Sequence, residues 1–205
     1  MPTATARKTA AKPGAKADIV PVRFATAKSW DTWLRRNGAS SDGLWLLFAK
    51  VGADEPTVTY AQAIESALCH GWIDGQKKSV DAQHWMQRFT PRRARSIWSK
   101  INCAKALALI ESGRMQPSGQ AQVDAAKADG RWDNAYDGAR TSTVPADLQA
   151  ALDAEPAARQ FFATLNATNR YAVLWRVQTA AKPETRAKRV AQLVAMLARH
   201  EKIHG

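Results

Sequence analysis

The fold is decided by residues 68–102, LCHGWIDGQKKSVDAQHWMQRFTPRRARSIWSKIN, where a helical pattern gives way to a strand pattern and then returns. Two runs rich in apolar and aromatic residues, at 72–73 and 84–89, flank a turn rich in glycine, lysine and serine, which predicts a β-hairpin. Pro91 ends the strand pattern, because proline cannot donate a ladder hydrogen bond. Ser96 or Ser99 is then expected to cap a helix.

Three elements are predicted before this hairpin. A helix is expected over 27–37, where tryptophan and leucine side chains recur on one face. The short apolar run LWLLF at 44–48 predicts a buried strand. Thr59 is expected to open a second helix, because Gln62 completes a capping box three residues later.

Everything after Pro91 is predicted to be helical, apart from a polar loop at 131–143. The first of these helices is expected to pack through Ile97, Ile101, Ala104 and Ala108 and to end at Gly113. The others are expected at about 118–128, 146–152, 156–165 and 168–181, with a last one from Pro183. The predicted fold class is therefore α+β: a small antiparallel sheet of about three strands with helices in the N-terminal half, and an all-helical C-terminal half.

The chain is expected to divide into three regions: a disordered basic tail at 1–20, a mixed α+β region at 21–135 and a helical region at 144–205. With 205 residues it can bury a sizeable core without disulfides or metals. We expect one core, and the sequence leaves open whether the C-terminal half shares it.

The composition favours a basic, soluble, cytoplasmic protein. Thirty Lys and Arg residues against eighteen Asp and Glu give a formal charge of +12, which attracts phosphates, acidic surfaces and anionic small molecules alike. No run approaches the roughly 18 apolar residues of a membrane helix. The N-terminal stretch has no apolar segment typical of a secretory signal. Cys69 and Cys103 are expected to be buried, reduced thiols.

No catalytic or cofactor motif is present in the sequence. It contains no GxGxxG, P-loop, nucleophile elbow or HExxH pattern. His200 and His204 are spaced like metal ligands on a helix, but they lie in the last six residues, where fraying is expected. Cys69 and His70 are too few for a zinc site. We therefore expect no metal and no cofactor.

The densest group of chemically distinctive residues lies in the same decisive stretch. Between Lys77 and Arg95 there are six basic residues and one acidic residue, with tryptophans beside them. If the hairpin meets the next helix, the arginines would converge on a helix N-terminus, which suits an anion. The candidate ligand-binding residues are Trp72, Asp74, Arg88, Arg92, Arg93, Ser96, Trp98 and Asn102. The alternative is a solvated basic face with tryptophans in the core.

Asp74 is the one candidate for catalysis. A carboxylate between apolar residues and Gly75 could act as a general acid or base. It could equally pair with a nearby arginine or cap a turn, so no catalytic residue is assigned.

Four segments carry a family resemblance: ALCHGWIDGQKK, RFTPRRARSIWSKIN, SGRMQPSGQAQVDAAKADGRWD and RYAVLWRVQTAAKPETRAKRV. They resemble the YdeI/OmpD-associated, or bacteriocin-protection, family from about Phe24 to Leu197. The resemblance implies that the helical region corresponds to the C-terminal part of that family. It also implies a role in stress or antimicrobial-peptide protection, and it supplies no catalytic residue.

Three functions are compatible with these observations. The first is a non-enzymatic binding protein with an anionic ligand or protein partner at 88–102. The second is nucleic-acid binding, which the charge and the aromatic residues available for stacking would support. The third is an enzyme on a small anionic substrate, with Asp74 as acid or base and the arginines as a clamp.

Overall fold

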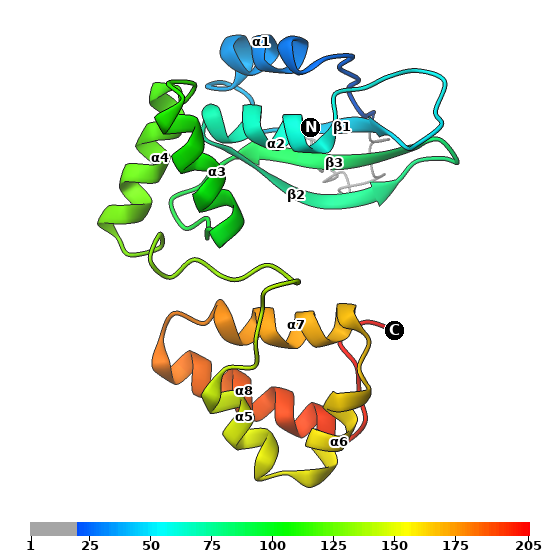
Figure 1. Cartoon of the computed structure of the whole chain (residues 1–205), viewed down its shortest axis with the longest axis vertical. Coiled ribbons are helices and arrows are strands. Elements are labelled where there is room, and N and C mark those ends of the chain that lie inside the picture. Colours follow the sequence, from blue (N-terminus) through cyan, green and yellow to red (C-terminus); the bar gives the residue numbers. More distant parts are fainter. Residues whose placement is uncertain (1–19) are drawn as a thin grey trace, which may run out of the picture.

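A computed structural model describes residues 20–205, so nearly all of the predicted basic tail lies outside the described residues. The predicted α+β class is confirmed: within this range there are eight helices and one three-stranded antiparallel sheet. The N-terminal part of the chain holds the sheet and four helices, and the C-terminal part holds the other four helices (Figure 1).

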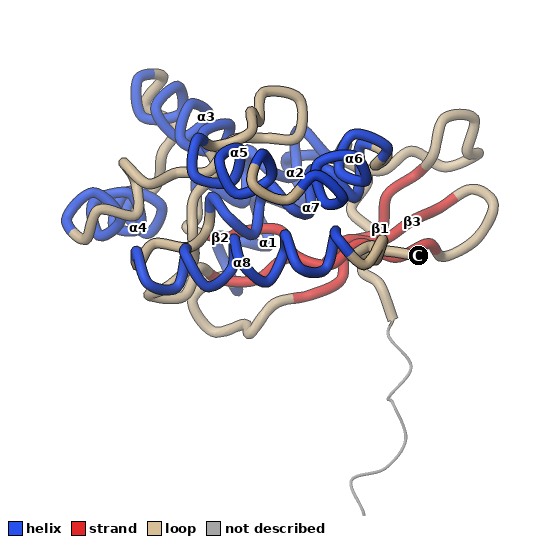
Figure 2. Tube along the Cα trace, turned by 90° about the horizontal axis from the view of Figure 1, so that it is seen from below, coloured by secondary structure: helices blue, strands red, loops and turns tan. Residues whose placement is uncertain are grey.

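The sheet has the strand order β1-β3-β2, formed by β1 (Leu44–Ala49), β2 (Trp72–Ser79) and β3 (His84–Pro91). The predicted hairpin of β2 and β3 is confirmed, with a register shift between Asp74 and Lys77. An irregularity of this kind bends a strand and redirects side chains. The loop after β1 and the β2–β3 turn project beyond the same end of the sheet (Figures 1 and 2).

Helices α1 (Ala27–Asn37) and α2 (Tyr60–Cys69) lie over one face of the sheet (Figure 1). The capping box predicted for Thr59 and Gln62 is confirmed. Trp30 of α1 is fully buried, and its ring contacts the rings of Trp72 and Phe89. These aromatic contacts make the N-terminal core.

Helix α3 (Lys100–Glu111) begins at Ser99, whose side chain accepts a hydrogen bond from the Asn102 amide. Its predicted apolar face is wrong, because the buried residues are Cys103, Ala106 and Leu109, and Ile101 is 54% exposed. Ile97, which belongs to the predicted face, precedes the helix. The helix also carries alanine at 104, 106 and 108 on opposite sides, so its sequence sets no clear phase.

Helix α4 (Pro117–Ala128) packs closely against the end of α2. The Gln116 amide donates to the Cys69 carbonyl, at 3.1 Å. A side chain at Gly119 would meet the Cys69 carbonyl oxygen at 2.3 Å, so only glycine fits there without a shift. Gly71, with φ of +76°, approaches the Ser118 carbonyl from the other side.

The C-terminal half consists of α5 (Ala146–Asp153), α6 (Pro156–Thr164), α7 (Ala167–Gln178) and α8 (Pro183–Ala198). All four were predicted within three residues at each end. Prolines at the first helical position start α6 and α8, where a missing N–H group is not needed.

The buried hydrophobic residues form two clusters rather than the one core expected from the sequence. One cluster runs from Phe24 to Ala135 and the other from Leu148 to Leu197. The segment between α4 and α5 passes between the two halves (Figure 1). The two halves therefore have separate cores.

Asp137 fixes the connecting segment to both halves. Its carboxylate pairs with Lys100 of α3 at 2.9 Å. Its backbone N–H donates to the Gln178 side chain at 2.8 Å, and its carbonyl accepts from the Tyr171 hydroxyl at 3.1 Å, both on α7. The junction of the halves is thus held by polar contacts.

Within 20–205, no helix combines the length and the apolar character needed to span a membrane. The same residues hold no group of three or more His, Cys, Asp or Glu side chains suited to a metal ion.

Asp31 joins α1 to the end of α2. One carboxylate oxygen lies 2.8 Å from His70 Nε2, and the other accepts from Arg35 at 3.0 Å. Burial alone raises the pKa of Asp31, but the hydrogen bonds and charges of His70 and Arg35 together outweigh it, so the pKa lies below its ordinary 3.8. A depressed carboxyl pKa stabilises the fold above the unfolded-state pKa, and the contribution is lost as pH falls through the folded-state pKa.

We therefore expect Asp31→Asn to reduce the loss of stability on acidification. The measurement is the urea midpoint at pH 7 and at pH 3 for both proteins. Asp133→Asn, at an exposed position, serves as the control and should keep the parental loss. An Asp31→Asn protein that loses as much stability as the parent would contradict this role.

Candidate functional site

Two cavities lie where the connecting segment meets both halves. The polar cavity, of about 380 Å³, is lined by α2, β2, α3, the connecting segment and α7. The aromatic cavity, of about 610 Å³, is lined by the connecting segment, α7 and the C-terminal residues. Tyr136 and Tyr171 line both cavities, so the two are neighbours that share a wall. Such junctions are common places for small-molecule sites.

Asp74 is the carboxylate of the polar cavity. Its Oδ2 accepts hydrogen bonds from the Tyr60 hydroxyl at 2.6 Å and from the Gln87 side-chain amide at 3.0 Å. Gln87 also donates to the Gly75 carbonyl at 2.7 Å, beside the register shift of β2. These contacts hold the carboxylate in one orientation, and its Oδ1 accepts no hydrogen bond from residues 20–205.

Three tyrosine hydroxyls surround the polar cavity. Burial, followed by the hydrogen bond to Asp74, strongly raises the pKa of the Tyr60 hydroxyl. Burial and the charge of Asp74 also raise the pKa of the Tyr136 hydroxyl. Burial raises the pKa of the Tyr171 hydroxyl as well. All three therefore remain protonated at neutral pH, and the Tyr60 and Tyr171 hydroxyls donate to Asp74 and to the Asp137 carbonyl.

The N-terminal end of α3 forms another wall of the polar cavity. Ser99, Asn102 and Lys105 line it from successive turns. The Lys105 ammonium makes no ion pair within the part of the chain that the structure describes. The cavity therefore presents one carboxylate and one ammonium, separated by hydroxyl and amide groups.

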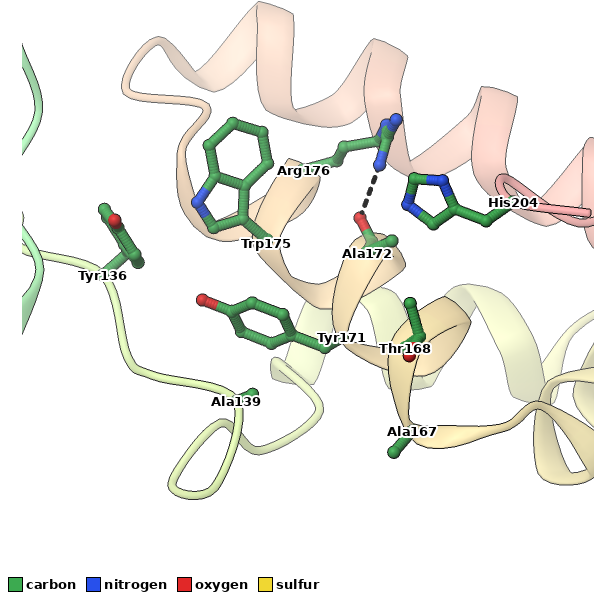
Figure 3. Close-up of a pocket in the computed structure, with 9 residues that line it drawn as sticks. All are labelled: Tyr136, Ala139, Ala167, Thr168, Tyr171, Ala172, Trp175, Arg176 and His204. Carbon is green, nitrogen blue, oxygen red and sulfur yellow. Dashed lines mark hydrogen bonds between the residues drawn. The ribbon is translucent and has the colours of Figure 1, made fainter. Parts of the chain in front are cut away.

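The aromatic cavity is lined mainly by apolar surface. Figure 3 shows the Tyr171 side chain pointing from α7 toward Tyr136 of the connecting segment, with the Trp175 indole next to it. The rings of Tyr136 and Trp175 meet edge to face, with centroids 6.2 Å apart. Trp175 is 37% exposed. Arg176 and His204 lie at the far end of the cavity (Figure 3).

Arg92 is buried next to this site but lines neither cavity. Its guanidinium carbon lies 3.5 Å from the centroid of the Trp98 ring, and Nη1 donates to the Ile97 carbonyl. Only 6% of the residue is exposed, and burial lowers its pKa to about 10, so it stays charged at neutral pH. Nε, Nη2 and the Trp98 indole N–H have no hydrogen-bond partner among the described residues.

The other predicted site residues lie elsewhere. Trp72 is in the core, and its indole N–H donates to the Gly38 carbonyl. Arg88 follows Gln87 on β3 and therefore faces the opposite side of the sheet, where it donates to the Asp42 carbonyl. Arg93 is exposed, and the Ser96 hydroxyl accepts from its backbone N–H.

Of the predicted residues, Asp74 and Asn102 line the polar cavity together, and Arg92 stacks on Trp98 behind it. The three arginines do not meet at the start of α3. Sequence reasoning missed Tyr60, Tyr136 and Tyr171, which complete the cavity walls. The local signal was limited to the aromatic residues Trp132 and Tyr136 within a loop that is mostly polar.

The comparisons with known proteins divide the chain at the same junction. Residues 22–122 match the model of a domain of unknown function (DUF8412). Residues 141–200 match the model described as bacteriocin-protection, YdeI or OmpD-associated. No curated protein and no solved structure matches the chain.

The family resemblance expected from about Phe24 to Leu197 is therefore confirmed for the C-terminal part. The segments GWIDGQ and RFTPRR, which suggested the same family, fall in the range matched by the domain of unknown function. The helical region formed by α5 to α8 is the part of this chain that is similar to the bacteriocin-protection, YdeI or OmpD-associated family.

Proposed function

We propose that this chain is a binding protein for a small amphipathic molecule, which it holds at the junction of its two halves. The observation that carries the proposal is the pair of cavities joined through Tyr136 and Tyr171. One offers hydrogen-bonding and charged groups, and the other offers apolar and aromatic surface. Ligand sites typically combine these two kinds of lining.

The polar cavity supports a ligand head that carries an amine. The free Oδ1 of Asp74 is an acceptor, while Tyr60 and Gln87 hold the other oxygen. Aromatic rings around a carboxylate favour a cationic nitrogen. Lys105 and Asn102 also line this cavity and could bind an anionic group on the polar end of the ligand. Anion binding, expected from the sequence, therefore remains part of the proposal.

The aromatic cavity supports a flat apolar body. The Tyr171 and Trp175 rings offer faces for stacking, and three alanines leave room beside them. The groups next to Asp74 are the Tyr60 hydroxyl and the Gln87 amide, which orient the carboxylate, and neither is an activated nucleophile. This arrangement favours binding over a chemical reaction.

The biological role and the cellular compartment are also part of the proposal. The family name of the C-terminal region points to bacteriocin protection, and sequestering a small molecule is compatible with a stress role. The free, buried thiols of Cys69 and Cys103 support action in the cytoplasm.

Three indole compounds with different heads test this proposal by calorimetry: tryptamine (cationic), tryptophan (zwitterionic) and indole-3-acetate (anionic). We expect both amines to bind about tenfold more tightly than the acid, the effect of one partly desolvated ion pair. Asp74→Asn should abolish that preference, because it removes the charge while keeping the shape.

Asp42→Asn removes the same charge at an exposed position and serves as the matched control. It should keep the preference for amines. Trp175→Ala should weaken all three compounds together, since it removes the wall that contacts their common body. If none of the compounds binds, or if Asp74→Asn and Asp42→Asn behave alike, the proposal is wrong.

A further inference from the structure

A third cavity, of about 340 Å³, lies between α1, α2 and the turn that joins α3 to α4, separate from the junction site. Lys28, Asp31 and Arg35 line it from one face of α1, at spacings of three and four residues. Arg114 and Gln116 line it from the turn. Side chains from three separate elements therefore converge on this cavity.

Its charge is mainly positive. Lys28 makes no ion pair or side-chain hydrogen bond within residues 20–205. Arg35 bonds Asp31 through one Nη atom, and Arg114 bonds Glu65 through one Nη atom, so each guanidinium keeps further N–H donors. Both oxygens of Asp31 are occupied, one by Arg35 and one by His70, which reduces its repulsion of an anion.

Ser66 adds a hydroxyl group to the lining of the cavity. The residue lines the cavity and is only 6% exposed, yet its hydroxyl forms no hydrogen bond with the described part of the chain. An acceptor inside the cavity would pair it.

We propose that this cavity binds the phosphate group of a small phosphorylated molecule. A phosphate offers several acceptor oxygens, which suit two arginine forks, a lysine and a serine hydroxyl at once. The cavity is larger than a phosphate group alone, so it has room for a short carbon skeleton next to Ala27 and Gln116. The overall charge of +12 attracts such anions toward the protein.

Calorimetric titration of the full chain at constant ionic strength tests this site, with inorganic phosphate and glycerol 3-phosphate as probes. Lys28→Gln is expected to weaken both probes about tenfold, since it removes one charge-assisted contact. Arg36→Gln is the matched control, because Arg36 is exposed on the same helix, does not line the cavity and carries the same charge.

Thermal unfolding gives a second readout, because a ligand that binds only the folded protein raises its melting temperature. Glycerol 3-phosphate should raise the melting temperature of the Arg36→Gln protein more than that of the Lys28→Gln protein. Equal binding by the two variants would overturn the proposal. Glycerol 3-phosphate that binds no more tightly than inorganic phosphate would also contradict it. Neither result bears on the indole compounds, whose cavities share no lining residue with this one.

Discussion

Replacing Trp30 with alanine is expected to lower the free energy of unfolding by about 4 kcal/mol, as for other buried aromatic residues. The side chain is 0% exposed, and its indole N–H donates to the Ala63 carbonyl at 3.2 Å. Its ring also contacts the rings of Phe24, Trp33, Trp72 and Phe89. The substitution leaves a large cavity at the centre of the N-terminal core. Urea unfolding followed by circular dichroism measures the loss.

Trp175→Ala is the matched control, because it removes an indole that is partly exposed and belongs to neither hydrophobic cluster. It should cost less than about 1 kcal/mol, which is typical of surface substitutions. Since the two cores are separate, the loss in Trp30→Ala should fall on the N-terminal half and spare α5 to α8. Equal losses in the two variants would show that Trp30 is not central to the core.

Gly119→Ala is expected to destabilise the protein by about 2 kcal/mol, although alanine is normally the better helix former. The added methyl carbon would lie 2.3 Å from the Cys69 carbonyl oxygen and 2.6 Å from that of Leu68. Both are backbone atoms at the end of α2, so α4 has to move away. The change is measured as a lower urea midpoint.

Gly75→Ala tests whether the effect comes from this contact. A methyl group at Gly75 would meet its nearest neighbour at 3.7 Å, an ordinary van der Waals distance. We therefore expect a loss well below that of Gly119→Ala. A Gly119→Ala protein as stable as the parent would mean that α2 and α4 separate at little cost.

The elements of the fold could be predicted where local chemistry specifies them. The capping box at Thr59 and Gln62 marks the start of α2, and proline at 156 and 183 marks the start of α6 and α8. The alternation of β3 accounts for a core residue at Phe89 beside a polar neighbour at Arg88. These signals act over a few residues, so they are visible in the sequence.

The division into two cores could not be predicted, because it depends on which helices meet. The sequences of α3 and of α5 to α8 show which helices have apolar side chains. They do not show whether those side chains join one hydrophobic cluster or two. Tertiary contacts also explain the position of Ile101 on α3. Ile101 lies outside the core, and its side chain lies close to Gly138 of the connecting segment. Only the tertiary structure shows that this neighbour exists.

The candidate site was predicted in part for a similar reason. Asp74 and Asn102 lie in the stretch 68–102, which is rich in charged and aromatic residues, so the sequence indicates them as candidates. Tyr60, Tyr136 and Tyr171 lie far apart in the sequence and meet only after folding. Arg88 does not join the other arginines as expected, because adjacent residues of a strand face opposite sides of the sheet. The Gln87 side chain faces Asp74, and this alternation could have been applied to the sequence.

The separation of the two cores has a consequence for melting. Each half can unfold without exposing the interior of the other, so the chain alone need not melt in a single step. A molecule seated between Asp74 on β2 and Trp175 on α7 would lose its site when either half opened. Its binding energy would then act on both halves together and merge two melting events into one. In such a protein, ligand binding controls the cooperativity of unfolding as well as the stability of the fold.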